Sequence, residues 1–194
     1  MFGVPRADTS TRMVFSDIVA DLDRLSLRDS ADRDAVLRWL AHAKAQLPTI
    51  AAPGQLAEKS YTRTLLYKTD AYELLALHWN KGVETMLHDH GGQQCWFAVI
   101  DGAMDVHNYR RTDSGGTVGK ARLQRLGEMR MNVGDIDYRA DDADIHRVAS
   151  LEFTTTLHLY ATPLGVYNVF DERRETCEAT TSSYDAFLTP ATPA

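Results

Sequence analysis

Short stretches in which apolar and polar side chains alternate make up most of this chain after Ser60. Such alternation is typical of β-strands, because successive side chains of a strand point to opposite faces of a sheet. Turn-forming residues separate the stretches. The expected strands are Tyr61–Tyr67, Tyr72–Trp79, Cys95–Ile100, Met104–Tyr109, Leu123–Leu126, Glu128–Asn132, His146–Ala149, Thr154–Ala161 and Val166–Phe170. So many short strands predict a mainly β protein, either a barrel or a sandwich.

The residues before Ser60 follow a different period. Apolar side chains between Phe15 and Leu47 recur at helical spacing, which predicts two helices within about residues 15–48. The expected boundaries are a cap of the second helix at Asp29 or Ser30, its end at Pro48, and a linker at Pro53-Gly54.

Two polar segments complete the predicted organisation. Arg111–Gly119 is rich in Asp, Ser, Thr and Gly and predicts an exposed hairpin loop. Residues 173–194 are expected to form a C-terminal tail, which is weakly ordered from Thr180. We therefore expect residues 1–194 to form one domain, with the barrel in about residues 60–172.

The composition narrows the class of protein. The 194 residues are 44% hydrophobic and 25% charged, as in one globular domain of ordinary size. A net charge of -6 disfavours nucleic acid and anionic membranes as partners, because both bind concentrated basic surfaces. The first residues have no apolar core of signal-peptide length, and two cysteines are too few for a disulfide framework. We expect a monomeric protein of the reducing cytoplasm.

A His-Asp-His sequence is the most informative chemical feature of the chain. On an extended strand, His88 and His90 point to one face with their Cα atoms about 7 Å apart, which suits a shared metal ion. His146, in another predicted strand, can add a third imidazole. Zinc, copper, iron and nickel all accept neutral imidazole, so ligand type leaves the metal open. The alternative is a polar strand end that happens to carry two histidines; the metal site is the better interpretation.

Two other predicted strands carry polar side chains on one face. Thr156, His158 and Tyr160 alternate with apolar neighbours, and inside a barrel a hydroxyl, an imidazole and a phenol can hydrogen-bond to one another. Tyr61 and Arg63 also share a face, and the planar guanidinium of Arg63 matches a carboxylate. The alternatives are a solvent-facing strand and a solvated surface arginine. We favour a pocket role for both faces.

The spacing of these residues resembles known motifs. The pattern Gly82, five residues, His88-Asp89-His90, four residues, Cys95, six residues, Gly102 resembles the first cupin motif, with Cys95 where many cupins carry Glu. The segment from Gly134-Asp135 to His146 resembles the second. More narrowly, the chain resembles the cysteine dioxygenase family at Tyr61-Thr62-Arg63, His88-Asp89-His90 with Cys95, Ile145-His146-Arg147-Val148 and Thr156-Leu157-His158-Leu159-Tyr160. This resemblance implies a cupin β-barrel, that is, a double-stranded β-helix or jelly roll, with N-terminal helices.

The resemblance also implies a role for each candidate side chain. The implied metal ligands are His88, His90 and His146 for ferrous iron, the substrate-binding residues are Arg63 and Tyr61, and the catalytic residues are Tyr160, His158, Thr156 and Cys95. Arg63 would hold the substrate carboxylate. Cys95 would form a thioether cross-link to the ring of Tyr160, as in animal members. Tyr167 stands where animal members carry a cysteine in the pocket.

The implied chemistry is consistent with a triad that has no carboxylate. Three neutral imidazoles leave Fe(2+) its full charge, which stabilises a bound thiolate. Both atoms of O2 would then be added to the sulfur, giving a sulfinic acid. The expected activity is dioxygenation of L-cysteine. The alternatives are the same reaction on 3-mercaptopropionate, for which related enzymes commonly carry Gln in place of Arg63, and a non-catalytic metal-binding cupin that senses a small acid.

Overall fold

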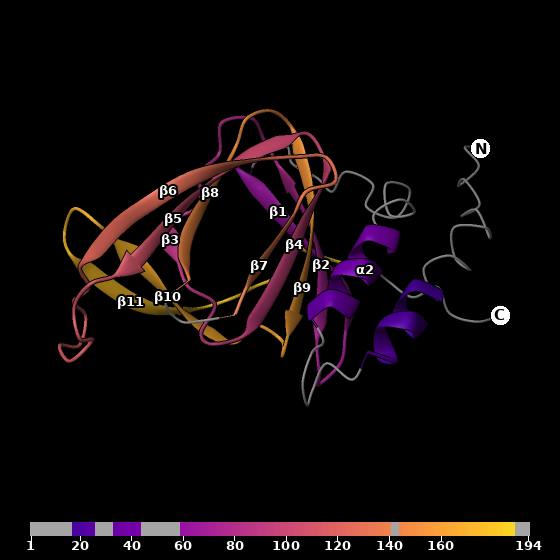
Figure 1. The fold of residues 1–194 in the computed structure, drawn as a ribbon, viewed down its shortest axis with the longest axis horizontal. Helices are drawn as coiled ribbons and strands as arrows, with labels where there is room; N and C mark the ends of the chain where they lie inside the picture. The colour runs from indigo at the N-terminus through magenta and orange to yellow at the C-terminus, as the bar shows by residue number, and fades with distance from the viewer. Residues whose placement is uncertain (1–16, 26–32, 44–58, 141–143, 189–194) are drawn as a thin grey trace, which may run out of the picture.

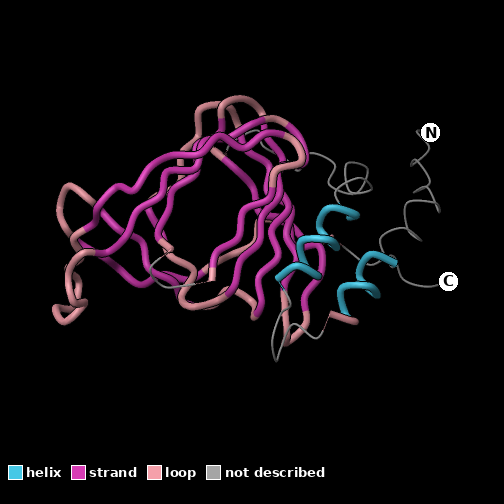
Figure 2. Tube along the Cα trace, in the orientation of Figure 1, coloured by secondary structure: helices cyan, strands magenta, loops and turns pink. Residues whose placement is uncertain are grey.

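The computed structural model describes residues 17–25, 33–43, 59–140 and 144–188, which form two six-stranded sheets beside a small helical layer (Figure 1). The first sheet has the order β12 (Ala186–Phe187), β1 (Tyr61–Lys68), β2 (Glu73–Trp79), β9 (Thr154–Ala161), β4 (Gln94–Asp101), β7 (Ile136–Arg139). The second has the order β11 (Thr176–Thr181), β10 (Val166–Asp171), β3 (Leu87–His88), β8 (Ile145–Ser150), β5 (Ala103–Arg111), β6 (Leu123–Asn132). Figure 2 shows the strands curving around a common interior. The prediction of a mainly β cupin fold with N-terminal helices is confirmed.

The helices cover the outer face of the first sheet. A short helix spans residues 17–23, and α2 spans Arg33–Ala43. Trp39 Nε1 donates a hydrogen bond to the carbonyl oxygen of Ile18 at 3.0 Å, so the two helices are tied together. Both contribute to one buried cluster with β2, β4 and β9, made by residues such as Leu22, Leu40, Leu74, Trp96 and Leu159. The two predicted helices are therefore present, while Asp29, Ser30, Pro48 and Pro53-Gly54 lie outside the described residues.

This arrangement explains why β2 and β9 are buried along their whole length. One face of each strand packs against the helices, and the other face points into the space between the sheets. In β9, Leu157 and Leu159 belong to the helix-facing cluster, whereas Tyr160 belongs to the inter-sheet cluster. None of the helices within the described residues is long and apolar enough to cross a membrane.

The observed strands differ from the predicted ones in more than their end residues. The stretches Leu123–Leu126 and Glu128–Asn132 are one strand, β6, because the register with β5 shifts at Asn108 and Tyr109 without ending the pairing. Of the extended strand expected at His88 and His90, only β3 is present and it ends at His88, while β7 was not predicted. With two and four residues respectively, they are too short for a periodic pattern.

The C-terminal tail expected over residues 173–194, weakly ordered from Thr180, instead contains two strands in the part that the structure describes. Residues Thr176–Thr181 form β11, which pairs with β10 along its whole length, and Ala186–Phe187 form β12, which pairs in parallel with β1. Each of these strands lies at one edge of its sheet, where one side faces solvent. This position explains the polar composition that suggested a tail. Residues 189–194 lie outside the described residues.

Candidate active site

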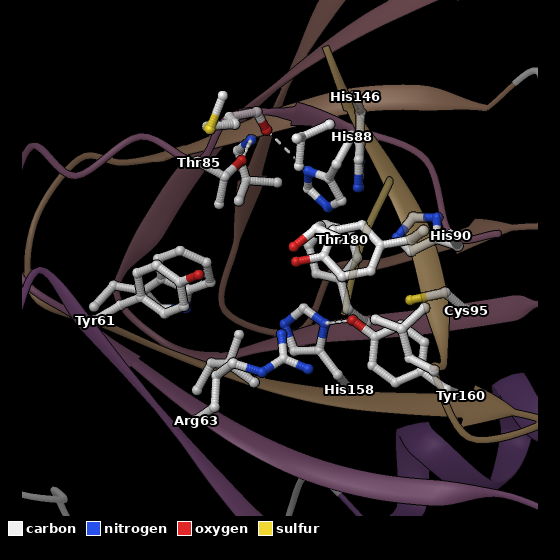
Figure 3. A pocket seen from close by; sticks show the side chains of 18 residues that line it. Tyr61, Arg63, Thr85, His88, His90, Cys95, His146, His158, Tyr160 and Thr180 are labelled. Atoms are coloured by element: carbon white, nitrogen blue, oxygen red, sulfur yellow. Dashed lines mark hydrogen bonds between the residues drawn. The ribbon is translucent and has the colours of Figure 1, made fainter. Parts of the chain in front are cut away.

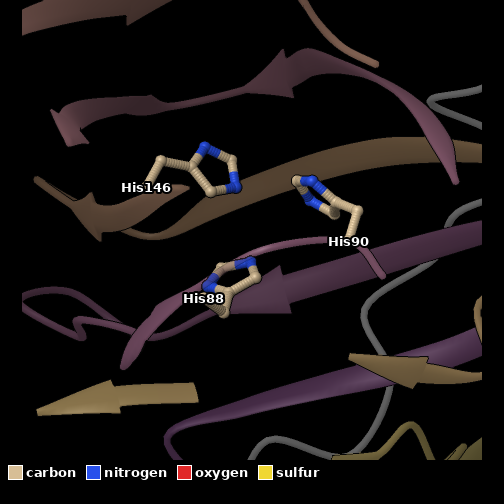
Figure 4. A group of neighbouring side chains, drawn as sticks. All are labelled: His88, His90 and His146. Atoms are coloured by element: carbon tan, nitrogen blue, oxygen red, sulfur yellow. The ribbon is translucent and has the colours of Figure 1, made fainter. Parts of the chain in front are cut away.

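Three histidine rings meet between the two sheets (Figure 4). His88 ends β3, His90 follows two residues later, and His146 lies in β8 directly opposite His88 in the strand register. The ring centroids are 4.7 Å apart for His88 and His146, 5.0 Å for His90 and His146, and 5.4 Å for His88 and His90. One nitrogen from each ring lies within 4.8 Å of the others. A single metal ion can contact all three.

The surroundings of the rings favour the neutral form that a metal requires. Burial lowers the pKa of His90 and of His146 well below the ordinary value for histidine. His88 Nδ1 lies 2.9 Å from the carbonyl oxygen of Met86, which holds the Nδ1 hydrogen and leaves Nε2 free to coordinate. Asp89 faces away, because its carboxylate accepts hydrogen bonds from the backbone and side chain of Asn168. The donor set is therefore three neutral imidazoles, which fits a divalent transition metal.

The triad opens into a cavity of about 270 Å³ (Figure 3). Eight of the nine site residues expected from the sequence line this cavity: Tyr61, Arg63, His88, His90, Cys95, His146, His158 and Tyr160. Thr156, the ninth, lies behind His158. The structure thus brings together residues from β1, β3, β4, β8 and β9 that are far apart in the sequence.

A hydrogen-bonded chain runs along one face of β9. Trp79 Nε1 donates to Thr156 Oγ1 at 2.9 Å, so the hydroxyl hydrogen of Thr156 is available to His158 Nε2, also at 2.9 Å. His158 Nδ1 then carries its hydrogen toward the Tyr160 oxygen at 3.5 Å. Burial lowers the pKa of His158 and raises that of Tyr160 far from their ordinary values. The imidazole is therefore neutral, and Tyr160 keeps its proton.

Cys95 and Tyr160 lie directly opposite each other on β4 and β9. The thiol is fully buried, and burial raises the pKa of Cys95 to about 12. A thiol with this pKa stays protonated at neutral pH and is a poor nucleophile. The informative feature is therefore its position, because the register of β4 and β9 places the thiol beside Tyr160.

Arg63 and Tyr61 reach the cavity from β1. The ring of Tyr61 stacks on Trp79 with a centroid distance of 4.6 Å. Arg63 Nη2 donates a hydrogen bond to Ser182 Oγ at 2.7 Å, while Arg63 Nε is buried and has no partner among the described residues. Figure 3 shows the guanidinium extending from β1 into the cavity on the side of His158. The cavity thus has a fixed positive charge opposite its metal-ligand triad.

Comparison with known proteins agrees with this site. The family model for cysteine dioxygenase type I matches residues 6–173 of the chain. The chain belongs to the cysteine dioxygenase type I family. It is therefore a cupin thiol dioxygenase with a site suited to a metal. Human cysteine dioxygenase type 1 is 22% identical over an alignment of 162 residues, and the alignment covers 81% of this chain and 79% of that protein. The Danio rerio enzyme is also 22% identical, over 165 residues, with the same coverage.

Solved structures with similar folds are more distant. KdgF from Halomonas sp. is 16% identical, with a TM-score of 0.44 over 58% of this chain and 87% of that chain. An uncharacterized conserved protein with a double-stranded β-helix domain from Klebsiella pneumoniae is 15% identical, with a TM-score of 0.46 over 63% of this chain and 87% of that chain.

Sequence reasoning missed several residues of this candidate site. Trp79 ends an apolar strand and is buried, but it also lines the cavity and donates a hydrogen bond to Thr156. Thr180 lines the cavity from β11, and Ser182 contacts Arg63. No motif marks these two residues. Both stand in a run of Thr and Ser after a predicted strand, and such a run has the composition of a loop. Their composition therefore argued against a place in the site.

Proposed function

We propose that this thiol dioxygenase uses Fe(2+) held by His88, His90 and His146 and acts on L-cysteine. The product would be cysteine sulfinic acid, in which both atoms of O2 are bonded to the sulfur. The observation that carries the proposal is a single cavity with a three-histidine triad and the guanidinium of Arg63. When bound, the iron would supply the affinity for thiolate and for O2. A small molecule with both a thiol and a carboxylate matches the two ends of the cavity.

The protein's own residues would then position the substrate and control protons. Arg63 would bind the carboxylate through charge-assisted hydrogen bonds and direct the thiol toward the histidines. Tyr160, held by His158 and protonated, would offer a hydrogen-bond donor beside the reacting sulfur. Buried apolar side chains in the wall, such as Leu77 and Phe97, lower the polarity around these charges, which strengthens each interaction.

One observation favours a second candidate, 3-mercaptopropionate. No Asp or Glu is among the described residues that line the cavity, so the ammonium group of cysteine meets no carboxylate from the protein. 3-Mercaptopropionate lacks that ammonium and would make the same contact with Arg63. A non-catalytic metal-binding cupin is the remaining alternative, in which case the metal would be retained without any reaction with O2.

Oxygen uptake separates these three candidates. Protein loaded anaerobically with iron should consume O2 on addition of L-cysteine, with an equal amount of cysteine sulfinate measured by mass spectrometry. The same assay with 3-mercaptopropionate is run in parallel. A higher kcat/KM for 3-mercaptopropionate would transfer the assignment to that thiol. No uptake with either thiol would contradict the proposed reaction.

We also propose that Cys95 becomes linked to Tyr160 through a thioether. The S–H and one ring C–H would be replaced by an S–C bond, and O2 would accept the two electrons and two protons. The intact mass should therefore fall by about 2 Da relative to the sequence mass. Cys95→Ser should abolish this shift, whereas Cys177→Ser, at a cysteine that is a free thiol away from the site, should retain it. An unshifted mass in protein that has turned over would contradict the cross-link.

A further inference from the structure

The segment after β11 returns to β1 and is bound to it beside Arg63. Asp185 and Arg63 are joined twice: Arg63 N donates to Asp185 Oδ2, and Asp185 N donates to the carbonyl oxygen of Arg63, both at 2.8 Å. Leu188 N donates to the carbonyl oxygen of Leu65 at 2.8 Å, and β12 pairs in parallel with Thr64 and Leu65. The backbone of Arg63 is thus fixed by a part of the chain more than a hundred residues later.

A second attachment holds the same segment against β2. The hydroxyl of Tyr184 donates to the carboxylate of Glu73 and accepts from Lys68 Nζ at 2.8 Å. Glu73 is fully buried and also accepts from Leu164 N at 3.1 Å. The carboxylate of Glu73 is therefore already paired with Lys68, Tyr184 and the backbone. It does not hydrogen-bond to Arg63.

Along the chain, Ser182 lies between Thr180, which lines the cavity, and these attachments. Its Oγ accepts from Arg63 Nη2 at 2.7 Å, and Arg63 forms no ion pair among the described residues. A hydroxyl orients a guanidinium without neutralising it, whereas an Asp or Glu at this position would occupy the fork and cancel its charge. Arg63 Nε and its remaining N–H groups are then left for a ligand, in a buried setting where an unpaired donor is costly.

We propose that Ser182 is a positioning residue that holds the guanidinium of Arg63 for the carboxylate of the substrate, and so contributes to the preference for thiols that carry a carboxylate. This inference rests on the proposed function, because it requires Arg63 to bind that carboxylate. Ser182 lies outside residues 6–173, the part of the chain that the family model matches. The C-terminal segment is therefore part of the substrate site of this protein.

Anaerobic titration calorimetry on the iron-loaded protein tests this role without turnover. The ligands are L-cysteine and cysteamine, which lacks the carboxylate, and the variants are Ser182→Ala, Ser182→Thr and Ser183→Ala. Ser182→Ala should weaken binding of L-cysteine about tenfold, the effect of one lost hydrogen bond to a charged group, and leave cysteamine unchanged. Ser182→Thr keeps the hydroxyl and should restore binding. Ser183 is exposed, so Ser183→Ala should match the wild type.

Steady-state kinetics and thermal unfolding complete the test. In Ser182→Ala the KM for L-cysteine should rise much more than kcat falls, and the unfolding temperature should match that of the wild type. Equal weakening for both ligands, or no effect on L-cysteine, would overturn the role of Ser182. So would wild-type protein that binds L-cysteine no more tightly than cysteamine. If the wild type binds L-cysteine but consumes no O2, the proposed reaction fails, while the contrast between the variants still decides the role of Ser182.

Discussion

His146→Ala should remove both the bound iron and the oxygen uptake of this protein. His146 supplies one of three buried imidazoles whose ligand atoms lie within 4.8 Å of one another, and it faces His88 across the strands. Loss of a residue that merely supports a ligand already weakens metal binding by about 10- to 100-fold. Loss of a ligand should exceed that range and leave two imidazoles, too few to hold the ion through dialysis. Metal content by elemental analysis and oxygen uptake with L-cysteine measure the two effects.

The matched control is His107→Ala. His107 lies on β5, next to β8 in the same sheet, but its ring contacts Arg125 and Glu128 on the outside of the barrel. This variant should retain about one iron per chain and wild-type oxygen uptake. If His146→Ala retained iron at the level of His107→Ala, the three-histidine site would be wrong. If it retained iron but lost oxygen uptake, His146 would act on the reaction rather than on metal binding.

Much of this site could be predicted from the sequence because its residues obey the period of a strand. Thr156, His158 and Tyr160 alternate with leucines, and the sheet places the first set toward the cavity and the second toward the helices. Predicting that Cys95 lies opposite Tyr160 also requires the register between β4 and β9, and no local sequence pattern contains that register. For that pair, resemblance to a family supplied what periodicity could not.

The residues that support the site were harder to predict for a physical reason. Ser182 and Asp185 sit in a polar segment whose pattern resembles that of a loop, yet they are held by β1, a strand over a hundred residues earlier. Trp79 has the pattern of a core residue and is one, but its indole N–H also meets a hydroxyl inside the barrel. A residue that only supports another site residue does so through a tertiary contact. Its residue type alone therefore does not predict that role.

Arg63→Gln should lower kcat/KM for L-cysteine by about a hundred- to a thousandfold while leaving any turnover of cysteamine nearly unchanged. The guanidinium reaches the cavity as a charge with a buried, unpartnered Nε, so a carboxylate ligand gains a charge-assisted contact that Gln cannot replace. Cysteamine has no carboxylate, so it loses no contact when the guanidinium is removed. The ratio of the two kcat/KM values therefore isolates the contact from any general loss of activity, and oxygen uptake with both thiols measures it.

Arg110→Gln is the matched control, since Arg110 is an exposed arginine on β5 whose guanidinium donates hydrogen bonds to Gln124. It should leave both thiols unaffected. A comparable loss for L-cysteine and cysteamine in Arg63→Gln would show that Arg63 supports the fold or the metal instead of the carboxylate. A larger defect in Arg63→Gln than in Ser182→Ala, with the same selectivity for L-cysteine, is the pattern expected when one residue binds the substrate and the other positions it.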